Sequence, residues 1–471
     1  MFETCAAKRK LPARKKRNLE QSMIRLPEDV KTIIDRLNAA GYEAYAVGGC
    51  VRDALLGKTP NDWDITTSAE PEEMKRCFQG MRLIETGLKH GTLTVMIRGE
   101  GYEVTTYRVD GEYSDHRRPD SVRFVKELKE DLARRDFTVN AMATKDGQEI
   151  VDLFGGCEDL KNRVIRCVGE ARQRFAEDAL RILRALRFAS VYDFSIEEST
   201  AKAASELKDT LKNVSEERIF TELKKLLCGK GVERILLDFP EIVYAILPEL
   251  EPMHDFRQNN PHHAYDVWTH TVKTVAAAPN DPVYRLAMLF HDSGKPAAHT
   301  VDAEGIDHFK LHQIISAGIA EKCLLRLKSD NATLRRALFL VREHDLRIPA
   351  TEKAVKKQII RLGSDEFMSL IPVFRADLMA QNPAMIPEKA AHVDALEQIA
   401  SRLIAENACL KISQLAVNGN DLKAIGVSGR ATGDMLKALL NEVALNGAVN
   451  ERDTLLALAK RLKHISGENH E

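Results

Sequence analysis

Two carboxylates, Asp62 and Asp64, stand two residues apart and are the side chains of this chain best suited to chemistry. If Trp63 between them lies in a strand, both carboxylates project to the same side of it, because side chains alternate along a strand. Two carboxylates on one side are the ligands that a pair of Mg²⁺ ions requires. The spacing therefore predicts a two-metal site that acts on phosphates.

A phosphate-binding turn is predicted shortly before these carboxylates. Gly48 and Gly49 follow a short apolar run and precede a predicted helix over Val51–Leu56. Two glycines let the backbone approach an anion closely, and the free N–H groups of the helix then face that anion. Each feature alone is common in turns and loops. Together they favour phosphate chemistry.

A second charged pattern lies within FAEDALRILRALRFA, Phe175 to Ala189, which we predict to form one helix. At about 100° per residue, its apolar side chains gather in one arc, and the charged ones occupy the opposite half. The charged residues are Asp178, Arg181, Arg184 and Arg187. A solvated helix face is one interpretation of this pattern. A base-reading pair of Asp178 and Arg181 is the other, since a carboxylate only accepts and a guanidinium only donates.

Such a pair distinguishes nucleobases by their pairing edges. Cytosine and adenine each present an exocyclic amine beside an unprotonated ring nitrogen. Asp178 would accept from the amine and Arg181 would donate to the ring nitrogen. Uracil and guanine present the reverse, which leaves buried polar groups unpaired at a cost of about 1–3 kcal/mol each. The pair therefore predicts acceptance of CTP and ATP and rejection of UTP and GTP.

The stretch from Gly48 to Asp64, Gly-Gly-x-Val-Arg-Asp-x-Leu-Leu-Gly followed by Asp-x-Asp, resembles the core motif of polymerase-β-type nucleotidyltransferases. The order of residues in this motif is similar to that in class II tRNA nucleotidyltransferases, the CCA-adding enzymes, and in bacterial poly(A) polymerases. The resemblance extends over roughly residues 26–250 and includes Glu177-Asp178-x-x-Arg181. It implies Mg²⁺-dependent addition of CMP, CMP and AMP to the 3′ end of tRNA. The nucleotide-binding residues that it implies are Gly48, Gly49, Arg52, Arg134, Arg135, Asp136, Asn140, Asp178, Arg181, Arg184 and Arg187.

Two further stretches bear on this site. Phe137, Val139 and Ala141 alternate after Arg134-Arg135, which predicts a strand that packs against the metal-binding strand. The resemblance implies that one of these two arginines grips the triphosphate in a bidentate manner. Glu103 lies on a predicted strand, Tyr102 to Tyr107. It is either a third catalytic carboxylate or an ordinary solvated strand residue, and both interpretations stay open.

A different resemblance begins near Asn259 and runs to Asp377. His270, the dipeptide His291-Asp292 and a late aspartate on another helix are similar to the signature of HD-type metal phosphohydrolase domains. Neutral imidazoles and carboxylates suit Mn²⁺, Ni²⁺ or Fe²⁺. We expect Asp377 to be the late ligand. The resemblance leaves open whether this domain is a hydrolase or a retained scaffold.

Alternative ligands are present in the same region. Asp345, beside His344, is the second choice for the late aspartate. His308 and His312 are candidates for a second metal. Any one of these histidines alone would be more typical of a structural residue.

The domain organisation follows from these stretches. The fold class that we expect is an α+β head of the polymerase-β nucleotidyltransferase type, with a small mixed sheet and helices, and then an all-α body, an all-α HD domain and a helical tail. The expected divisions are a basic disordered arm over 1–22, the head over 23–165, a helical neck with base-selecting and RNA-binding helices over 166–250, the HD domain over 251–400 and the tail over 401–471.

The tail contains a candidate contact for the tRNA backbone. Gly426, Gly429 and Arg430 stand between a short predicted helix and a second one starting near Thr432. Glycine spacing of this kind is similar to helix–hairpin–helix turns, whose N–H groups hold a phosphate without reading sequence. A helix that ends at an ordinary capping glycine is the alternative.

Bulk properties narrow the function classes. The chain has 471 residues and a formal net charge of −1, so its overall charge does not indicate a nucleic-acid partner. Lys8 to Arg17 nevertheless holds seven basic residues, and Asp110 to Ser121 forms a polar, Arg-rich loop that the resemblance places over the active site. Eight scattered cysteines without a Cys-x-x-Cys pair predict reduced thiols and a cytoplasmic protein. No membrane partner is expected, and the oligomeric state stays open.

Several functions remain to be separated. The leading hypothesis is full CCA addition, and a partial enzyme that adds only CC or only A is its variant. A poly(A) polymerase is the alternative within the same fold, although ETGLKHGTLTV, Glu85 to Val95, resembles the tRNA-directed members. A phosphohydrolase with a nucleotide-sensing head is the alternative from another class. The intact Asp62 and Asp64 pair argues against it.

Overall fold

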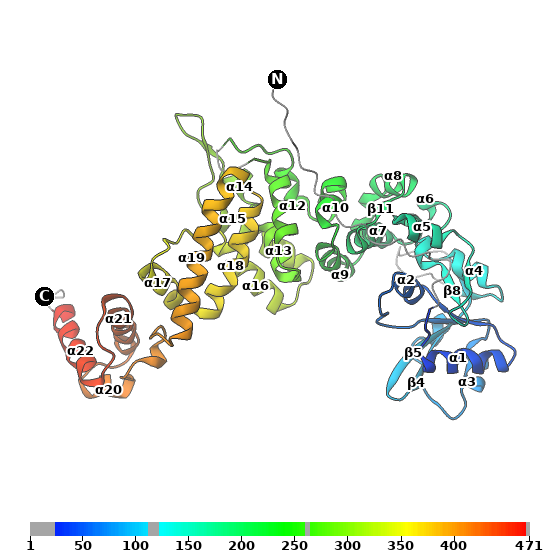
Figure 1. Ribbon diagram of the computed structural model, residues 1–471, viewed down its shortest axis with the longest axis horizontal. Coiled ribbons are helices and arrows are strands. Elements are labelled where there is room, and N and C mark those ends of the chain that lie inside the picture. Colours follow the sequence, from blue (N-terminus) through cyan, green and yellow to red (C-terminus); the bar gives the residue numbers. More distant parts are fainter. Residues whose placement is uncertain (1–23, 112–121, 260–263, 468–471) are drawn as a thin grey trace, which may run out of the picture. The chain divides into compact units, whose positions relative to one another are not determined.

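The computed structural model describes residues 24–111, 122–259 and 264–467. The chain divides into two compact units, Met1–Ser215 and Glu216–Glu471 (Figure 1). This boundary falls inside the predicted neck, and the finer divisions of the chain stay predictions. The basic arm, Lys8 to Arg17, and residues 112–121 of the Arg-rich loop lie outside the described residues.

A seven-stranded mixed sheet forms the centre of the first unit, with the strand order β3-β4-β5-β2-β1-β8-β9. All neighbours pair antiparallel except β2 and β5, which are parallel. The alternating pattern of β4 and β5 buries Leu93, Val95 and Val104, as expected for strands with one covered face. The strands of this sheet are β1 (Ala44–Val47), β2 (Ile65–Thr67), β3 (Arg82–Ile84), β4 (Thr92–Ile97), β5 (Glu100–Thr106), β8 (Met142–Thr144) and β9 (Ile150–Asp152).

Helices cover this sheet and follow it. The first, α1, begins after Pro27 and turns Val30, Ile33 and Leu37 into the core beside β1. Two short strand pairs join the helices, β6 (Arg108–Asp110) with β7 (Val122–Phe124) and β10 (Val164–Ile165) with β11 (Ser195–Ile196). The helices are α1 (Glu28–Ala39), α2 (Gly49–Leu55), α3 (Pro71–Cys77), α4 (Leu128–Ala133), α5 (Gly156–Asn162), α6 (Ala171–Glu177), α7 (Leu180–Tyr192) and α8 (Glu198–Glu206). The predicted α+β head is confirmed.

Two predicted strands are wrong in detail. Asp62 and Asp64 lie in the loop before β2 rather than in a strand, because pairing begins only at the β-branched, buried run from Ile65. Residues 137–141 are also not a strand. They contain the 3₁₀ turn η3 (Thr138–Asn140). All five are buried, so their apolar alternation does not mark a sheet face.

The predicted single helix from Phe175 to Ala189 is in fact two helices. The chain leaves α6 at Asp178, which has an extended backbone with φ −139° and ψ 104°. The Asp178 carboxylate accepts a hydrogen bond from the N–H of Leu180 at 3.1 Å. An aspartate that bonds its own local backbone competes with helix, and this bond starts α7 afresh.

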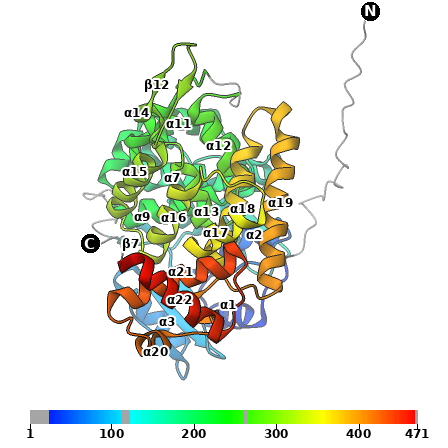
Figure 2. The same cartoon turned by 90° about the vertical axis from the view of Figure 1, so that its left-hand side faces the viewer.

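The second unit is helical apart from one small hairpin, β12 (Thr300–Val301) with β13 (Asp307–His308). Its central helices α12, α13, α15, α16 and α18 pack on one another. Figure 1 and Figure 2 show α20, α21 and α22 gathered around an apolar core of Leu422, Leu439 and Leu455, and α21 also packs on α17. The helices are α9 (Glu216–Leu227), α10 (Val232–Asp238), α11 (Pro240–Ile246), α12 (Val267–Ala277), α13 (Pro282–Phe290), α14 (Lys295–Ala298), α15 (His312–Arg326), α16 (Asn331–Glu343), α17 (Glu352–Leu362), α18 (Ser364–Met379), α19 (Ile386–Ala405), α20 (Gly419–Ala424), α21 (Arg430–Asn446) and α22 (Arg452–Gly467).

Two global expectations can be checked on the described part of the chain. Its cysteines are all free, namely Cys50, Cys77, Cys157, Cys167, Cys228, Cys323 and Cys409. None of its helices combines the length and the apolar character that crossing a bilayer demands.

Candidate functional site

The glycine turn before α2 depends on glycine for two reasons. Gly48 has φ +85°, a conformation that side-chain-bearing residues rarely adopt. A Cβ at this position would also lie only 2.8 Å from Nη1 of Arg135. The Gly48 N–H donates to the carbonyl of Met142 at 3.1 Å, which ties the turn to β8. The turn therefore lies directly against an arginine of the predicted triphosphate pair.

Arg52 of α2 is buried and bonded to protein groups. Its Nε and Nη2 donate to the carboxylate of Asp53 at 3.0 and 3.1 Å, and its Nη1 donates to Oδ1 of Asn140. The guanidinium also lies over the rings of Tyr192 and Phe188, 4.7 and 5.0 Å from their centroids. Arg52 thus attaches α2 to η3 and α7. It holds the glycine turn in place rather than pointing freely at a ligand.

Three carboxylates meet where the central strand β2 begins beside β5. Ile65 pairs with Val104, so the register places Glu103 of β5 beside Asp64. The pKa of Asp64 is raised to about 6, first by partial burial of its carboxyl and then by the charges of Asp62 and Glu103. Arg135 acts on Asp64 in the opposite direction. All three residues remain exposed to solvent, so the cluster is an accessible concentration of negative charge.

A fully buried carboxylate, Asp131, orients the two arginines. Arg134 donates to it from Nε and Nη2 at 3.0 and 2.8 Å, and Arg135 donates from Nη2 at 3.4 Å. Burial alone would raise the pKa of Asp131, but these two guanidinium groups hold it below its ordinary value. Within the described residues, Nε of Arg135 has no hydrogen-bond partner. Arg135 therefore keeps donor capacity next to Gly48.

Asp136 joins α7 to η3 in the same way. It accepts from Nε of Arg184 and from Nδ2 of Asn140, both at 2.9 Å. Although burial opposes ionisation, Arg184 and Asn140 hold the pKa of Asp136 well below its usual range. Arg187, one turn further along, lies 3.8 Å from the ring centroid of Phe188. The arginine face of α7 is therefore packed onto the head, and the interpretation as a solvated face is wrong.

Each partner of the predicted base-reading pair is bonded to protein groups on its own side of the helix break. Arg181 is buried, and its Nη1 donates to Oε2 of Glu177 at 2.7 Å. Its Nη2 donates to the carbonyl of Arg134 at 3.1 Å. Asp178 sits at the helix break and bonds the backbone of Leu180. The Arg181 N–H also donates to the carbonyl of Asp178 at 2.9 Å, so the two residues stay adjacent across the break, and their role in base selection stays a prediction.

The second unit brings the predicted HD residues together in its interior. Nε2 of His270, on α12, lies 3.0 Å from Oδ1 of Asp377, on α18, and 3.3 Å from Nε2 of His291. Nε2 of His291 lies 3.2 Å from Oδ2 of Asp292. Asp345, the second choice, instead forms an ion pair with Arg347 at 3.8 Å. The site joins four side chains from three helical segments.

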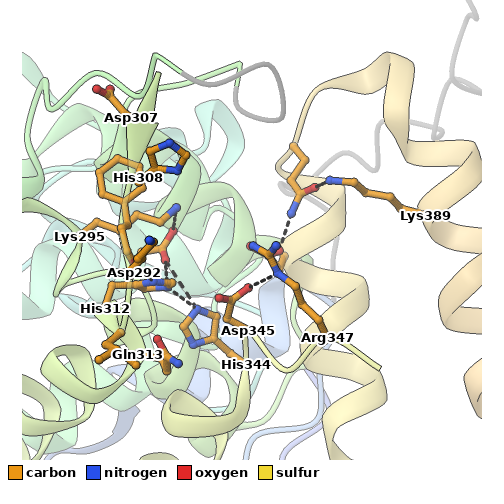
Figure 3. Close-up of a pocket in the computed structure, with 15 residues that line it drawn as sticks. Asp292, Lys295, Asp307, His308, His312, Gln313, His344, Asp345, Arg347 and Lys389 are labelled. Atoms are coloured by element: carbon orange, nitrogen blue, oxygen red, sulfur yellow. Dashed lines mark hydrogen bonds and ion pairs between the residues drawn. The ribbon is translucent and has the colours of Figure 1, made fainter. Parts of the chain in front are cut away.

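Asp292 also belongs to a second cluster (Figure 3). Its Oδ1 lies 3.3 Å from Nε2 of His312 and 3.6 Å from Nε2 of His344, and these two nitrogens are 3.1 Å apart. His308, expected here, lies on β13 and bonds Asp302 at 2.6 Å. The expected pair of His308 and His312 is therefore corrected to His312 and His344. A sequence signal for His344 existed, since His344-Asp345 repeats the dipeptide His291-Asp292.

The four histidines share one tautomer-setting arrangement. In each, Nδ1 is within 2.7–3.1 Å of a backbone carbonyl, and a carbonyl can only accept. In their neutral forms these imidazoles therefore carry the proton on Nδ1, and Nε2 then presents its lone pair to the cluster. Second-shell bonds of this kind orient metal-binding histidines. The donor set fits two borderline metal ions that share Asp292.

A positive charge accompanies this centre. Nζ of buried Lys295 forms an ion pair with Oδ2 of Asp292 and donates to Oε1 of Gln258, both at 2.7 Å. A cavity of about 670 Å³ opens above the two clusters, and Lys310 and Arg347 are among its lining residues. Anionic ligands of moderate size are therefore suited to it.

The candidate tail turn has a capped helix end. Gly426 and Gly429 have φ +76° and +64°, and Gly429 directly precedes α21. Lys463 donates to the carbonyls of Ile425 and Gly426 at 3.2 and 3.1 Å. These bonds satisfy the end of α20, as the capping interpretation expects. Phosphate binding by this turn and by Arg430 stays a prediction.

Comparisons with known proteins agree with this architecture. Residues 44–166 match the family model of the poly A polymerase head domain, and residues 193–253 match the model of a probable RNA- and SrmB-binding site of polymerase A. The CCA-adding enzyme of Enterococcus faecalis is 50% identical over 224 residues, which cover 47% of this chain and 55% of that protein. The chain thus spans about half the length of the most similar curated relatives.

Other relatives match over nearly their whole length. The CCA-adding enzyme of Ligilactobacillus salivarius is 31% identical over 453 residues, which are 93% of this chain and 98% of that one. The crystal structure of the Bacillus stearothermophilus CCA-adding enzyme in complex with CTP aligns with a TM-score of 0.68 and 29% identity. It covers 93% of this chain and 98% of its own. With the head, the following helices and the full-length match in agreement, the chain belongs to the CCA-adding enzyme family.

Proposed function

We propose that this chain adds C, C and A to the 3′ end of tRNA, with CTP and ATP as donors. The observation that carries the proposal is the meeting of Asp62, Asp64 and Glu103 beside Arg135 and the Gly48 turn. Related CCA-adding enzymes have been crystallised with CTP and with ATP, which supports these two donors. Another relative has been crystallised with a tRNA, which supports the acceptor.

The three carboxylates would hold Mg²⁺, since accessible hard oxygen ligands suit that ion. When bound, Mg²⁺ neutralises the triphosphate and favours ionisation of the primer hydroxyl. Arg135 would donate to the triphosphate from Nη1, which lies beside the Gly48 turn, while Asp131 keeps the guanidinium oriented. The 3′-hydroxyl oxygen of the tRNA attacks the α-phosphorus, the bond to the bridging oxygen breaks, and pyrophosphate leaves with those electrons.

Base choice falls to Asp178 and Arg181 acting from either side of the helix break. Arg181 uses three of its five N–H donors on Glu177, Arg174 and Arg134, which fixes its plane and leaves two donors for a ring nitrogen. Asp178 supplies the acceptor for the exocyclic amine. Because the break separates the two side chains, small shifts of α6 against α7 adjust the pair to cytosine or adenine.

An extension assay on tRNA that lacks its 3′ end tests the proposal. Each nucleotide is supplied alone and with the others, and products are resolved to one residue. Full CCA addition predicts two residues with CTP alone and three with CTP and ATP. A ladder of many residues with ATP alone would support the poly(A) polymerase, and a stop after CC or addition of A only to a CC end would show a partial enzyme.

We also propose a second function, metal-dependent hydrolysis of phosphate esters in the helical unit. The specific observation in its favour is that Asp292 is shared by two histidine clusters whose Nε2 atoms all face inward. His270, His291, Asp292 and Asp377 would hold one ion, and Asp292, His312 and His344 the other. Bound metal would supply an activated water and charge for the phosphate. Although burial opposes ionisation, His291 and Lys295 hold the pKa of the shared Asp292 carboxyl well below its usual range.

Metal analysis separates this function from a purely structural domain. The full-length protein is stripped with chelator, reloaded with Mn²⁺ or Ni²⁺, and analysed for bound metal and for hydrolysis of simple phosphate esters. Two ions per chain and measurable hydrolysis are expected. Protein that binds no metal after reloading would rule out the proposal.

A further inference from the structure

Helices α2 and α7 are joined near their C-terminal ends by one hydrogen bond. Tyr192, the last residue of α7, donates from its hydroxyl to Oδ1 of Asp53 on α2 at 2.7 Å. Burial raises the pKa of Tyr192, so its phenol stays protonated and remains a donor at neutral pH. Because the acceptor is a carboxylate, this bond is stronger than one between neutral groups. It connects two segments that are 139 residues apart in the chain.

Aromatic and cationic side chains pack around this bond. The rings of Tyr192 and Phe188 stack with their centroids 6.1 Å apart and their planes 20° from parallel. The Arg52 guanidinium lies over both rings, and Nζ of Lys58 lies 4.1 Å from the centroid of the Tyr192 ring. Such cation–π contacts add to the attachment. We call Arg52, Asp53, Phe188 and Tyr192 the α2–α7 joint.

A second connection between the same helices runs through η3. Arg52 donates to Oδ1 of Asn140, whose Nδ2 donates to Asp136 at 2.9 Å. The Asp136 carboxylate also accepts from Nε of Arg184, on α7, at 2.9 Å. Arg184 and Tyr192 lie about 12 Å apart along the helix axis, since each residue rises about 1.5 Å. One attachment would leave α7 free to pivot, whereas two attachments at this spacing fix its tilt against α2.

This tilt matters because the two helices begin at different parts of the proposed nucleotide site. Helix α2 begins at Gly49, directly after the Gly48 turn that the proposed reaction places at the triphosphate. Helix α7 begins at Leu180, next to Arg181, the proposed donor to the base. The position of one helix on the other therefore sets the span between the triphosphate end and the base end of the site.

We propose that Tyr192 is a positioning residue for base selection and that it acts through its bond to Asp53. The inference rests on the proposed CCA addition and deepens it. Because the joint fixes α7 to α2, the adjustment between cytosine and adenine falls to α6 and Asp178, across the helix break. Without the bond α7 tilts, so Arg181 moves off the ring nitrogen of cytosine and excludes the ring N–H of uracil less strictly.

Tyr192→Phe tests the inference, because it removes the hydroxyl and keeps the ring of the joint. In extension of tRNA that lacks its 3′ end, the kcat/KM ratio of CTP over UTP should fall about three- to tenfold, as expected for one lost hydrogen bond. Affinity for inorganic pyrophosphate, which depends on the triphosphate end alone, should keep the parent value. Tyr244→Phe, which loses a 3.1 Å hydroxyl bond to His254 in the other unit, is the matched control and should keep the ratio.

A double-mutant cycle shows whether the bond itself carries the effect. Asp53→Ala should lower the ratio at least as far as Tyr192→Phe, since Asp53 also orients Arg52. In the Asp53→Ala background, Tyr192→Phe should lower it no further. Losses that multiply in the double variant, or a lower unfolding temperature with an unchanged ratio in Tyr192→Phe, would overturn the inference.

Calorimetric titration with CTP and with UTP separates this inference from the proposed activity, because binding requires no transfer. A parent that binds CTP selectively but extends no tRNA would refute CCA addition. Loss of that selectivity in Tyr192→Phe would still support the positioning role. The same selectivity in the parent and in Tyr192→Phe would overturn the role, whatever the rates of transfer.

Discussion

The two candidate centres hold acidic groups in opposite ways. In the head, Asp62, Asp64 and Glu103 are exposed residues with no histidine among them, and the pKa of Asp64 is raised to about 6 by partial burial of its carboxyl and by the charges of Asp62 and Glu103. In the helical unit, Asp292 is buried among four histidines and a lysine. Exposed oxygens without nitrogen ligands suit Mg²⁺ that arrives with a nucleotide, and buried imidazoles suit a resident transition metal. The two centres of this chain therefore offer contrasting sets of metal ligands.

The largest effect should come from the head carboxylates. Asp62→Ala removes a ligand that no neighbour replaces, so transfer of both C and A should fall by roughly a thousandfold or more, while CTP binding partly survives. Asp35→Asn, an exposed carboxylate on α1, serves as the control. Rates come from single-turnover extension. Near-parent rates for Asp62→Ala would show that the head carboxylates do not hold the metal used in nucleotide transfer.

A smaller but more diagnostic effect is expected at the helix break. Asp178→Ala should lower discrimination against UTP by about ten- to a hundredfold, because the acceptor that makes uracil unsuitable is gone. Triphosphate affinity should change little, since Asp131 and Arg135 are untouched. The ratio of kcat/KM for CTP and UTP measures this, with the exposed Arg172→Ala as control. Unchanged rejection of UTP would remove Asp178 from base selection.

Proton competition should sharpen the description of the helical centre. Burial lowers the pKa of His291, but Asp292 and Asp377 outweigh it and raise the pKa to about 9 in the metal-free protein. Below that value His291 is protonated, and a metal must displace the proton. Mn²⁺ affinity should therefore rise about tenfold per pH unit up to about pH 9 and then level off. Calorimetry in two buffers of different ionisation enthalpy detects the released proton, and pH-independent affinity would contradict the assignment.

The smallest effect concerns the glycine turn, and the chain offers a matched pair. Gly48→Ala and Gly41→Ala both force alanine into a positive φ, at about 1–3 kcal/mol of unfolding free energy each. Only the Cβ at Gly48 meets Arg135, since nothing lies within 4 Å of a Cβ at Gly41. We expect similar losses of stability in thermal unfolding, but a raised KM for CTP only in Gly48→Ala. Equal KM values for CTP in the two variants would show that the Gly48 turn does not contribute to triphosphate binding.

Local patterns predicted the head, whereas features that depend on distant contacts were missed. The sheet and the strand carrying Glu103 follow from alternation over β4 and β5. The helix break at Asp178 depends on one hydrogen bond from the Leu180 N–H to the Asp178 carboxylate. A helical wheel shows only the direction of side chains and cannot predict such a bond. The same limit applies to Arg181, whose partner Glu177 is four residues away and whose second partner is a backbone carbonyl from the head.

The HD centre shows the same division between local and distant information. The local sequence predicts both the dipeptide His291-Asp292 as a metal-binding motif and its place at the end of an apolar helix. Which other histidines reach Asp292 depends on how α15 and α16 pack, and packing brings His344 rather than His308 to the site. The position of Asp62 and Asp64 in the loop before β2 likewise depends on a distant contact, because strand pairing begins only at Ile65.

A cross-assay of two variants tests the central claim that the two centres serve separate chemistries. Asp64→Asn and His291→Ala are each measured for extension of tRNA lacking its 3′ end and for metal retained after reloading. Asp64→Asn should lose extension and keep the metal of the helical unit, and His291→Ala should lose that metal and extend tRNA at the parent rate. Loss of both properties in His291→Ala would contradict the account, because the helical unit would then be a structural support of the head.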